Sequence, residues 1–330
     1  MIELNNPEVQ FAAKAVRRAA LLARQIRQES EVIALSKEDY SPVTIADFAC
    51  QAVVGALLES AFPEATLVAE EDSRALALPE GAGILDQVTA YCQREIPGAD
   101  PVRVRKWIDL GGSPPGDRFW TLDPIDGTKG FLRGDQYATA LALVADGEVQ
   151  LGAIACPNLN PDGSADPDGP GSFVIAVRGQ GAWAAPLEKP DTLTALRVSG
   201  RDDPSEARML RSFEAGHTNT GQIGEVIDRL GVAADPVRMD SQAKYCVLAA
   251  GGGELLLRLL SPSKPDYREK IWDQAAGSII VEEAGGRVTD IEGRRLDFSA
   301  GRTLDRNRGI LASNGLLHAR TLAALEAIGT

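Results

Sequence analysis

Two aspartates, Asp123 and Asp126, lie three residues apart in the segment FWTLDPIDGTKGFLRGDQYA, residues 119–138. Two carboxylates this close repel each other unless a cation lies between them. If the chain turns through Pro124 and Ile125, both carboxylates and the Ile125 carbonyl can point at one place. Asp-Pro and Asp-Gly pairs are also common in ordinary turns, so the motif by itself does not separate a turn from a metal site.

The two residues that follow these aspartates favour phosphate chemistry. Gly127 allows the backbone to pass close to a ligand. Thr128 offers a hydroxyl and begins a predicted helical segment, whose free N–H groups can hold a phosphate oxygen. A cation between the aspartates would cancel their repulsion and polarise a phosphoryl group beside it.

Other acids lie at the ends of predicted elements: Asp47, Glu70, Glu71 and Asp273. Asp47 alone is a first-turn acid favoured by the helix dipole, and Asp273 alone is a helix N-cap. The pair at 70–71 alone is a solvated charge run. Together with the two aspartates they form an oxygen-only donor set, which suits Mg²⁺ or Mn²⁺ better than Zn²⁺. Roles in turns and helix caps can explain each acid separately, but they explain the occurrence of all of them together poorly.

The composition excludes several other classes of function. The chain has 330 residues, 44% of them hydrophobic, which is enough for one large or two moderate domains. No apolar run approaches the roughly 20 residues that span a bilayer, and no secretory signal is visible. The formal net charge of −13 disfavours nucleic acid, whose binding depends on Lys and Arg contacts to phosphates. We expect a cytoplasmic protein with no membrane, nucleic-acid or obligate protein partner. A small phosphorylated substrate is compatible with the acidic charge if a local positive site or bound cations hold it.

Local patterns predict the elements that position these residues. Four segments show helical periodicity or helix-end signals: 7–29, 45–61, 219–231, and a run from Asp273 to Gly286 that Asp273 caps. Strand-like runs occupy 65–72, 119–122, 138–145, 148–156, 172–185, 236–240 and 254–260. Pro124 is expected to stop the strand at 119–122 from continuing. Asp146-Gly147 predicts a hairpin turn, and a second hairpin turns at 179–181. Residues 79–118 are less regular, and 157–171 form an exposed loop.

These elements predict an α+β fold of layered sheets and helices, with a largely antiparallel N-terminal sheet. Hairpins dominate the first half of the chain, whereas helices and strands alternate in the second. The stretch PLEKPDTL, residues 186–193, resembles an inter-domain linker. We therefore expect an N-terminal domain over 1–193 that carries most of the acids, and a C-terminal domain over 194–330. The four cysteines are scattered and are expected to be buried free thiols.

Several motifs resemble the inositol monophosphatase superfamily of lithium-sensitive, Mg²⁺-dependent phosphatases. The motifs are DPIDGT after an aromatic strand, the upstream Glu-Glu pair, and WDQAAG near the C-terminus. The longer forms SPVTIADFACQ, TKGFLRGDQYA, ACPNL, MDSQAKY and YREKIWDQAAG are similar to the 3'(2'),5'-bisphosphate nucleotidase branch. The resemblance spans about residues 8–320 and implies the αβαβα sandwich of the inositol monophosphatase and fructose-1,6-bisphosphatase type.

The resemblance also implies a role for each site residue. The ligands of two or three Mg²⁺ ions would be Glu70, Asp123, the Ile125 carbonyl, Asp126 and Asp273. Asp47 and Thr128 would activate the attacking water, and Glu71 would support a metal ligand from behind. The substrate would contact Gly127, Thr128, His217, Ser241, Lys244, Arg258 and Asp273.

The implied reaction is hydrolysis of the 3'-phosphate of adenosine 3',5'-bisphosphate to AMP and phosphate, a step in sulfur metabolism. The 5'-phosphosulfate analogue is a further candidate substrate. An inositol polyphosphate 1-phosphatase, or another phosphatase of phosphorylated polyols, would use the same chemistry on a different substrate. A non-catalytic nucleotide sensor on this fold is a third possibility, although such a protein would be expected to have lost Asp47 or Thr128, and both are present.

Overall fold

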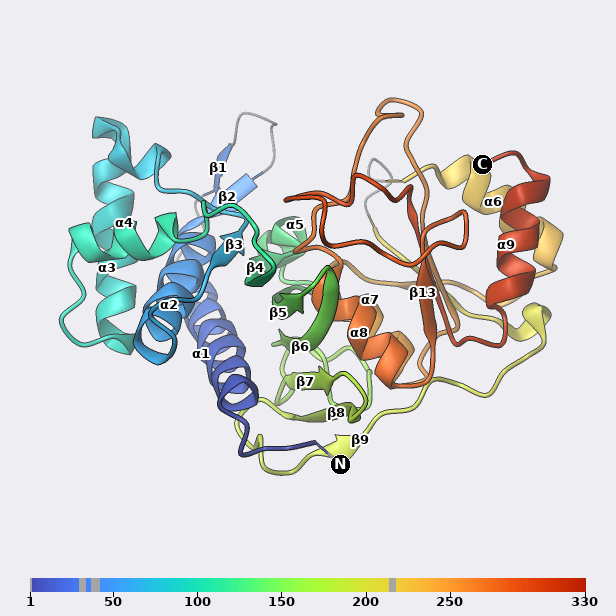
Figure 1. Ribbon diagram of the computed structural model, residues 1–330, viewed down its shortest axis with the longest axis horizontal. Coiled ribbons are helices and arrows are strands. Elements are labelled where there is room, and N and C mark those ends of the chain that lie inside the picture. The colour runs from blue at the N-terminus through green and yellow to red at the C-terminus, as the bar shows by residue number, and fades with distance from the viewer. Residues whose placement is uncertain (1, 30–33, 37–41, 214–217) are drawn as a thin grey trace.

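The computed structural model describes residues 2–29, 34–36, 42–213 and 218–330 (Figure 1). Its α-helices are α1 (Pro7–Glu29), α2 (Ile45–Ala61), α3 (Ala82–Glu95), α4 (Pro101–Asp109), α5 (Thr128–Arg133), α6 (Thr220–Leu230), α7 (Ala243–Ala249), α8 (Ala275–Glu283) and α9 (His318–Ala327). Its strands are β1 (Ala34–Ser36), β2 (Pro42–Thr44), β3 (Leu67–Ala69), β4 (Arg118–Asp126), β5 (Ala138–Ala145), β6 (Glu148–Cys156), β7 (Ser172–Val177), β8 (Gly181–Pro186), β9 (Thr194–Ala195), β10 (Met209–Arg211), β11 (Val237–Arg238), β12 (Leu255–Arg258), β13 (Arg287–Thr289) and β14 (Ile310–Ser313).

The first large sheet has seven strands in the order β3-β4-β5-β6-β7-β8-β9. Every neighbouring pair is antiparallel except β3 and β4, which confirms the prediction of a largely antiparallel N-terminal sheet. Both predicted hairpins are present. The turn between β5 and β6 holds Asp146 and Gly147 at φ of 51° and 76°, the left-handed geometry that this dipeptide favours.

The second large sheet has five strands in the order β11-β10-β12-β14-β13. The strands β11, β10 and β12 run parallel, and β14 and β13 are antiparallel to their neighbours. Their parallel carboxyl ends meet at one edge of the sheet, which is where open α/β sheets commonly bind ligands.

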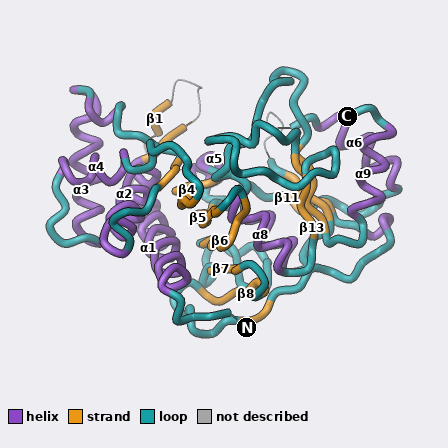
Figure 2. The backbone as a smooth tube through the Cα atoms, viewed as in Figure 1, coloured by secondary structure: helices purple, strands orange, loops and turns teal. Residues whose placement is uncertain are grey.

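Helices and sheets alternate in five layers (Figures 1 and 2). Helices α1 and α2 cover one face of the seven-stranded sheet, α7 and α8 lie between the two sheets, and α6 and α9 cover the far face of the second. Separate hydrophobic clusters fill the successive interfaces. This is the αβαβα sandwich that the sequence resemblance implied.

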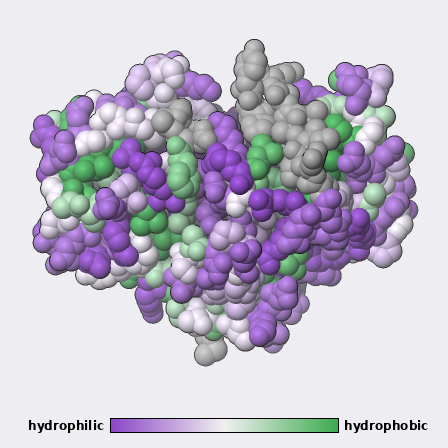
Figure 3. Space-filling model, turned by 180° about the vertical axis from the view of Figure 1, so that it is seen from behind, coloured by the Kyte–Doolittle hydropathy of each residue, from purple (hydrophilic) through white to green (hydrophobic). Residues whose placement is uncertain are grey.

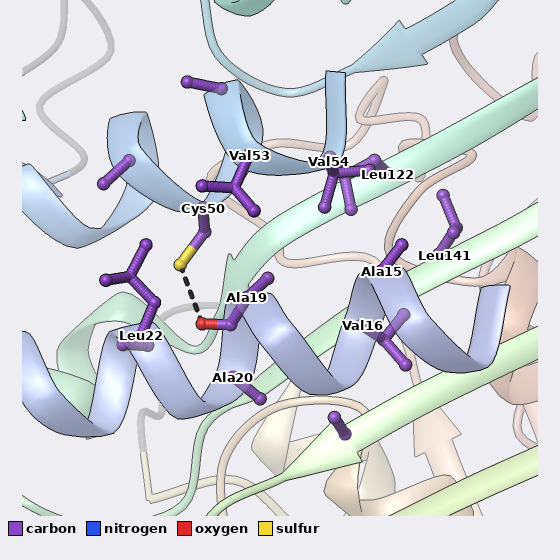
Figure 4. Packing of buried hydrophobic residues seen from close by; sticks show 14 of the residues in the cluster. Ala15, Val16, Ala19, Ala20, Leu22, Cys50, Val53, Val54, Leu122 and Leu141 are labelled. Atoms are coloured by element: carbon purple, nitrogen blue, oxygen red, sulfur yellow. Dashed lines mark hydrogen bonds between the residues drawn. The ribbon is translucent and has the colours of Figure 1, made fainter. Parts of the chain in front are cut away.

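The first interface packs small side chains between α1 and α2 (Figure 4). Ala19 and Ala20 of α1 are fully buried, and the Cys50 thiol of α2 donates a hydrogen bond to the Ala19 carbonyl at 3.2 Å. Such small residues let the two helices approach closely. The result is a rigid support for the first turn of α2, which carries Asp47. All four cysteines are buried and free, as predicted.

Three sequence expectations are wrong in detail. Strand β4 does not stop at Pro124 but continues to Asp126, because its register with β5 shifts between Asp123 and Asp126 and spares proline a ladder hydrogen bond. Asp273 does not cap α8, which begins two residues later without a side-chain cap. The stretch 79–118, expected to be irregular, contains helices α3 and α4.

The predicted domain boundary falls at β9, which pairs with β8 at the edge of the seven-stranded sheet. That sheet therefore ends just after the predicted linker, and the division at 193/194 stays a prediction. Hydrophilic residues predominate on the face that Figure 3 shows. Within the described ranges, no helix combines the length and apolar character needed to cross a bilayer.

Candidate active site

A cavity of about 330 Å³ lies between residues of the first large sheet and residues of the second. Strand β4 and the start of α5 form one wall, and the carboxyl ends of β10, β11 and β12 form the opposite wall. The turn that precedes α8 closes a third side. Acidic, basic and apolar side chains all line this cavity, so it can hold both a cation and an organic anion.

Strand β4 delivers two carboxylates to the cavity. Asp123 is 2% exposed, and its Oδ1 atom has no hydrogen-bond partner among the described residues. Asp126 accepts a hydrogen bond at 2.6 Å from the backbone N–H of Gln242, which lies at the start of α7. The shift in register between them, not a tight turn, is what allows both aspartates to face the cavity.

Gly127 lets the two walls touch. Its φ of 83° lies in the left-handed region, and a Cβ placed there would lie 2.9 Å from the Cβ of Ser241. Ser241 is itself in a left-handed conformation, at φ of 65°, which is uncommon for a residue with a side chain. The two unusual conformations bring Asp126 and Gln242 within hydrogen-bond distance across the cavity floor.

The acids raise one another's pKa values. Burial, followed by the charges of Glu70, Asp126 and Asp273, holds the pKa of Asp123 well above its usual value. Burial, followed by repulsion from Asp126 and Glu70, does the same for Asp273, although Arg258 opposes the shift. Buried carboxylates that destabilise one another's charged form are an environment that a cation would relieve.

The donor set therefore fits a hard divalent cation. It offers only carboxylate and carbonyl oxygens, it includes the unpartnered Oδ1 of Asp123, and it carries excess negative charge. Across the residues that the structure describes, no three acidic, histidine or cysteine side chains already converge as a closed ligand cage. The acids are nevertheless close enough to raise one another's pKa values.

Asp47 lies behind the cavity and reaches it through Thr128. Its Oδ2 accepts hydrogen bonds from the backbone and hydroxyl of Thr44, which forms a capping box at the start of α2. Its Oδ1 lies 3.4 Å from the Thr128 hydroxyl, and that hydroxyl is also 3.2 Å from the Ile125 carbonyl. The hydroxyl has a single proton, so donation to Asp47 leaves the Ile125 carbonyl available for a cation.

Two cations stand opposite these acids, the buried Lys244 and the partly buried Arg258. Lys244 donates a hydrogen bond to the Met239 carbonyl at 3.3 Å, and burial lowers its pKa to about 8, although Asp126 opposes this. Arg258 pairs with Glu269 at 2.9 Å. Burial opposes the charge on Arg258, but Glu269 and Asp273 outweigh it and raise its pKa. The Nε of Arg258 is buried and has no partner in the described chain.

The structure brings most of the predicted site residues to one cavity. Those that line it are Glu70, Asp123, Ile125, Asp126, Gly127, Thr128, Ser241, Lys244, Arg258 and Asp273. Asp47 contacts the lining residue Thr128. Glu71 is not a lining residue; it is buried behind Glu70, and Gln51 holds its backbone N–H and carbonyl. His217 lies outside the described residues.

A model of the inositol monophosphatase family matches residues 5–330. The chain belongs to this family. A 3'(2'),5'-bisphosphate nucleotidase of Oryza sativa is 43% identical over 338 residues, which cover 97% of this chain and 93% of the relative. The resemblance seen in the sequence is confirmed.

Solved structures with this fold include the Thermotoga maritima IMPase TM1415, with a TM-score of 0.67 and 23% identity over 97% of both chains. An IMPase/NADP phosphatase complexed with Mg²⁺ and phosphate matches with a TM-score of 0.62 and 19% identity, over 94% of this chain and 92% of its own. These matches confirm the inositol monophosphatase fold.

Sequence reasoning missed several residues that hold this inositol monophosphatase site together. Gln242 donates to Asp126 through its backbone, donates to the Trp272 carbonyl through its side chain, and accepts from the Gly277 N–H. Arg302 donates to the carbonyls of Ala69 and Gly111. Gln242 lies within the motif MDSQAKY, but nothing in the local sequence marks its partners, which lie far away along the chain.

Proposed function

We propose that this member of the inositol monophosphatase family hydrolyses the 3'-phosphate of adenosine 3',5'-bisphosphate to give AMP and phosphate. The name and high identity of the Oryza sativa relative support this substrate. The 5'-phosphosulfate analogue carries the same 3'-phosphate and is a second candidate substrate. The single observation that carries the proposal is the acid cluster around the buried Asp123, beside a Thr128 hydroxyl that is linked to Asp47.

Mg²⁺ is the cofactor that suits the donor set, with two or three ions per site. Glu70, Asp123, the Ile125 carbonyl, Asp126 and Asp273 would hold it, with Glu71 supporting Glu70 from behind. When bound, such an ion polarises the phosphoryl group and neutralises the charge that develops on its oxygens.

The chain's own residues position and deprotonate water. Thr128 donates to Asp47, so its oxygen is free to accept a hydrogen bond from a water molecule aimed at phosphorus. As the water attacks, its proton passes to the Thr128 oxygen while the Thr128 proton passes to Asp47. The bond between phosphorus and the 3'-oxygen breaks, the bonding electron pair stays on that oxygen, and the oxygen takes a proton from a solvent water to give the 3'-hydroxyl.

The two proposed domains have different tasks. Residues 1–193 supply Asp47, Thr128 and most of the metal ligands, and residues 194–330 supply Asp273 and most of the substrate contacts. The proposed substrate contacts are Gly127, Thr128, His217, Ser241, Lys244, Arg258 and Asp273. The hydrogen bond between Asp126 and Gln242 keeps the two parts in register.

A phosphate-release panel tests the proposal. The substrates are adenosine 3',5'-bisphosphate, its phosphosulfate, inositol 1,4-bisphosphate, inositol 1-phosphate and fructose 1,6-bisphosphate, each with Mg²⁺, with chelator, and with Li⁺ at limiting Mg²⁺. We expect the highest kcat/KM with a 3'-phosphorylated nucleotide, none with chelator, and inhibition by Li⁺. Preferred turnover of inositol 1,4-bisphosphate would instead establish the polyol phosphatase alternative, and full turnover in chelator would exclude the metal mechanism.

A further inference from the structure

Helix α2 carries two buried polar side chains on one face. Asp47 and Gln51 are four residues apart, so they lie one turn from each other on the same side of the helix. They are 1% and 0% exposed. Asp47 contacts the Thr128 hydroxyl, and Gln51 contacts the loop after β3, which carries Glu70. One helix therefore contacts both the hydroxyl proposed to activate water and the loop of a proposed metal ligand.

The Gln51 side chain bonds to the backbone of two segments that are distant in sequence. Its Nε2 donates to the Glu71 carbonyl at 2.6 Å and to the Ile108 carbonyl at 2.8 Å. Its Oε1 accepts from the Glu71 N–H at 3.0 Å. Both amide protons are thus committed, and the orientation of the amide is fixed because only its oxygen can accept from an N–H. Gln51 joins α2, the loop after β3 and the last turn of α4 at one point.

Glu70 is held between this point and strand β4. Its N–H donates to the Leu122 carbonyl at 3.3 Å, one residue before Asp123. On its other side, Glu71 is held by Gln51 at both its N–H and its carbonyl. Strand β3 itself offers few ladder hydrogen bonds, because it has three residues and forms an edge of the seven-stranded sheet. The position of Glu70 relative to Asp123 therefore depends on Gln51 as well as on β4.

We propose that Gln51 is a positioning residue for the metal site, which fixes the place of Glu70 and so sets the affinity of the site for Mg²⁺. This inference rests on the proposed function, in which Glu70 is a ligand. Groups that hold metal ligands from behind commonly change metal affinity by about 10- to 100-fold when they are removed. Because Gln51 acts through the backbone of the ligand loop, its loss should change the Mg²⁺ concentration needed for activation more than the kcat at saturating Mg²⁺.

The first test compares Gln51→Met with Asn314→Leu by calorimetric titration of Mg²⁺. Methionine has nearly the shape of glutamine but cannot make these hydrogen bonds, so the apparent Kd for Mg²⁺ should rise by about 10- to 100-fold. Asn314 is a matched buried amide, 2% exposed. It donates to the carbonyls of Ser199 and Arg201 and accepts from the Leu317 N–H, all in the second half of the chain. Asn314→Leu should keep the wild-type Kd. An unchanged Kd in Gln51→Met, or an equal loss in both variants, would overturn the inference.

A second pair of variants displaces the Gln51 amide without removing it. A Cβ placed on Gly111, two residues after α4, would lie 2.6 Å from Nε2 of Gln51 and 2.7 Å from Cβ of Ala69. A Cβ on Gly112 would lie 3.3 Å from the Asp109 carbonyl instead. Neither glycine has a positive φ, so alanine carries no conformational penalty of that kind at either position. Gly111→Ala should raise the Kd for Mg²⁺ by about 10-fold, and Gly112→Ala should keep it. Equal Kd values in these two variants would refute the inference even if Gln51→Met does not fold.

Mg²⁺ activation of phosphate release gives the matching kinetic readout. The midpoint of activation in Gln51→Met should shift to Mg²⁺ concentrations about 10- to 100-fold higher. A purely structural role would lower the amount of active enzyme and leave the midpoint in place, and that result would contradict the proposal. The calorimetric titration does not depend on turnover. A wild type that binds Mg²⁺ but releases no phosphate from any substrate would end the proposed function, and the Kd of Gln51→Met would still decide on the role of this residue.

Discussion

The Thr128 hydroxyl lies 3.4 Å from Oδ1 of Asp47, while the other oxygen of the same carboxylate caps helix α2. Asp47 thus has one structural and one chemical contact. Asp47→Asn keeps an oxygen for the cap but cannot take the Thr128 proton. We expect kcat to fall by about 10²- to 10⁴-fold, the usual contribution of a positioned base, in a phosphate-release assay with saturating Mg²⁺.

Two further variants separate these contacts. Thr44→Ala removes the capping side chain and leaves the link to Thr128, so it should lower the free energy of unfolding by about 1 kcal/mol and leave most activity. Thr128→Ser should retain activity that Thr128→Val loses, because only serine keeps the hydroxyl. Normal kcat in Asp47→Asn or in Thr128→Val would contradict the proposed water activation.

Asp123 is held in place at a cost to stability. Burial and repulsion from Glu70, Asp126 and Asp273 all disfavour its charge, and its Oδ1 has no partner in the described chain. Asp123→Asn should therefore raise the melting temperature in chelator, by about 2–4 °C for each kcal/mol relieved. Mg²⁺ should raise the melting temperature of the wild type much more than that of the variant. A less stable variant in chelator, or equal Mg²⁺ shifts, would argue against a cation at this position.

Gly127 is required both for its left-handed backbone conformation and for its close contact with Ser241. A matched pair of substitutions can separate the two effects. Gly127→Ala must adopt a φ of 83° and also meet Ser241 at 2.9 Å, whereas Gly231→Ala, after α6, meets only the conformational penalty at φ of 70°. The conformation alone costs about 1–2 kcal/mol. Chemical denaturation should show a larger loss for Gly127→Ala, with a rise in KM that Gly231→Ala does not share. Equal stability losses would mean that the walls can separate freely.

Sequence alone predicted the parts of this protein that depend on short-range signals. Periodic apolar residues located α1 and α2, and Asp146-Gly147 located a hairpin. Helix α4 was missed although Asp100 caps it and Pro101 begins it, a signal that was present but not used. Helix α3 has no side-chain cap to reveal it. The path of β4 beyond Pro124 depends on pairing with β5, which local propensity does not encode.

The candidate site also has parts that local sequence predicts and parts that depend on contacts between distant residues. The combination of DPIDGT with Asp47, the Glu70-Glu71 pair and Asp273 predicted the chemistry, whereas DPIDGT alone is also compatible with an ordinary turn. The contacts that assemble the site join residues far apart in sequence, such as Arg302 to Ala69 and Gln242 to Asp126. The pairing of Arg258 with Glu269 likewise follows only from the packed structure.

Arg302 joins the loops that carry two of the proposed ligands. It donates to the Ala69 carbonyl at 2.5 Å, one residue before Glu70, and its guanidinium lies 4.8 Å from the ring centroid of Trp272, one residue before Asp273. Arg302→Met should lower Mg²⁺ affinity by about 10- to 100-fold, measured by calorimetry as well as by Mg²⁺ activation. Arg306→Met, which removes only exposed contacts with Asp297 and Ser299, is the matched control. Unchanged Mg²⁺ binding in Arg302→Met would show that the two loops hold their positions without it.

His318 makes stability depend on pH far from the active site. It is 1% exposed, and its ring nitrogens lie 2.8 Å from the Ser313 hydroxyl and 3.0 Å from the Thr289 hydroxyl. Burial, with a smaller effect of Arg287, lowers its pKa to about 4 from the ordinary 6.5. In the unfolded chain His318 therefore becomes protonated as the pH falls below 6.5, whereas in the folded protein it stays neutral until about pH 4. This contribution is complete above pH 6.5 and is lost as the pH falls.

The expected loss between pH 7 and pH 5 is about 2 kcal/mol of unfolding free energy, from the linkage between proton binding and folding. Urea denaturation of the wild type and of His318→Gln at both pH values checks it. Glutamine can still donate and accept hydrogen bonds but does not titrate, so the stability gap between the two proteins should narrow by that amount at pH 5. A gap that stays constant would mean that His318 is protonated in the folded protein, with both hydroxyls acting as acceptors.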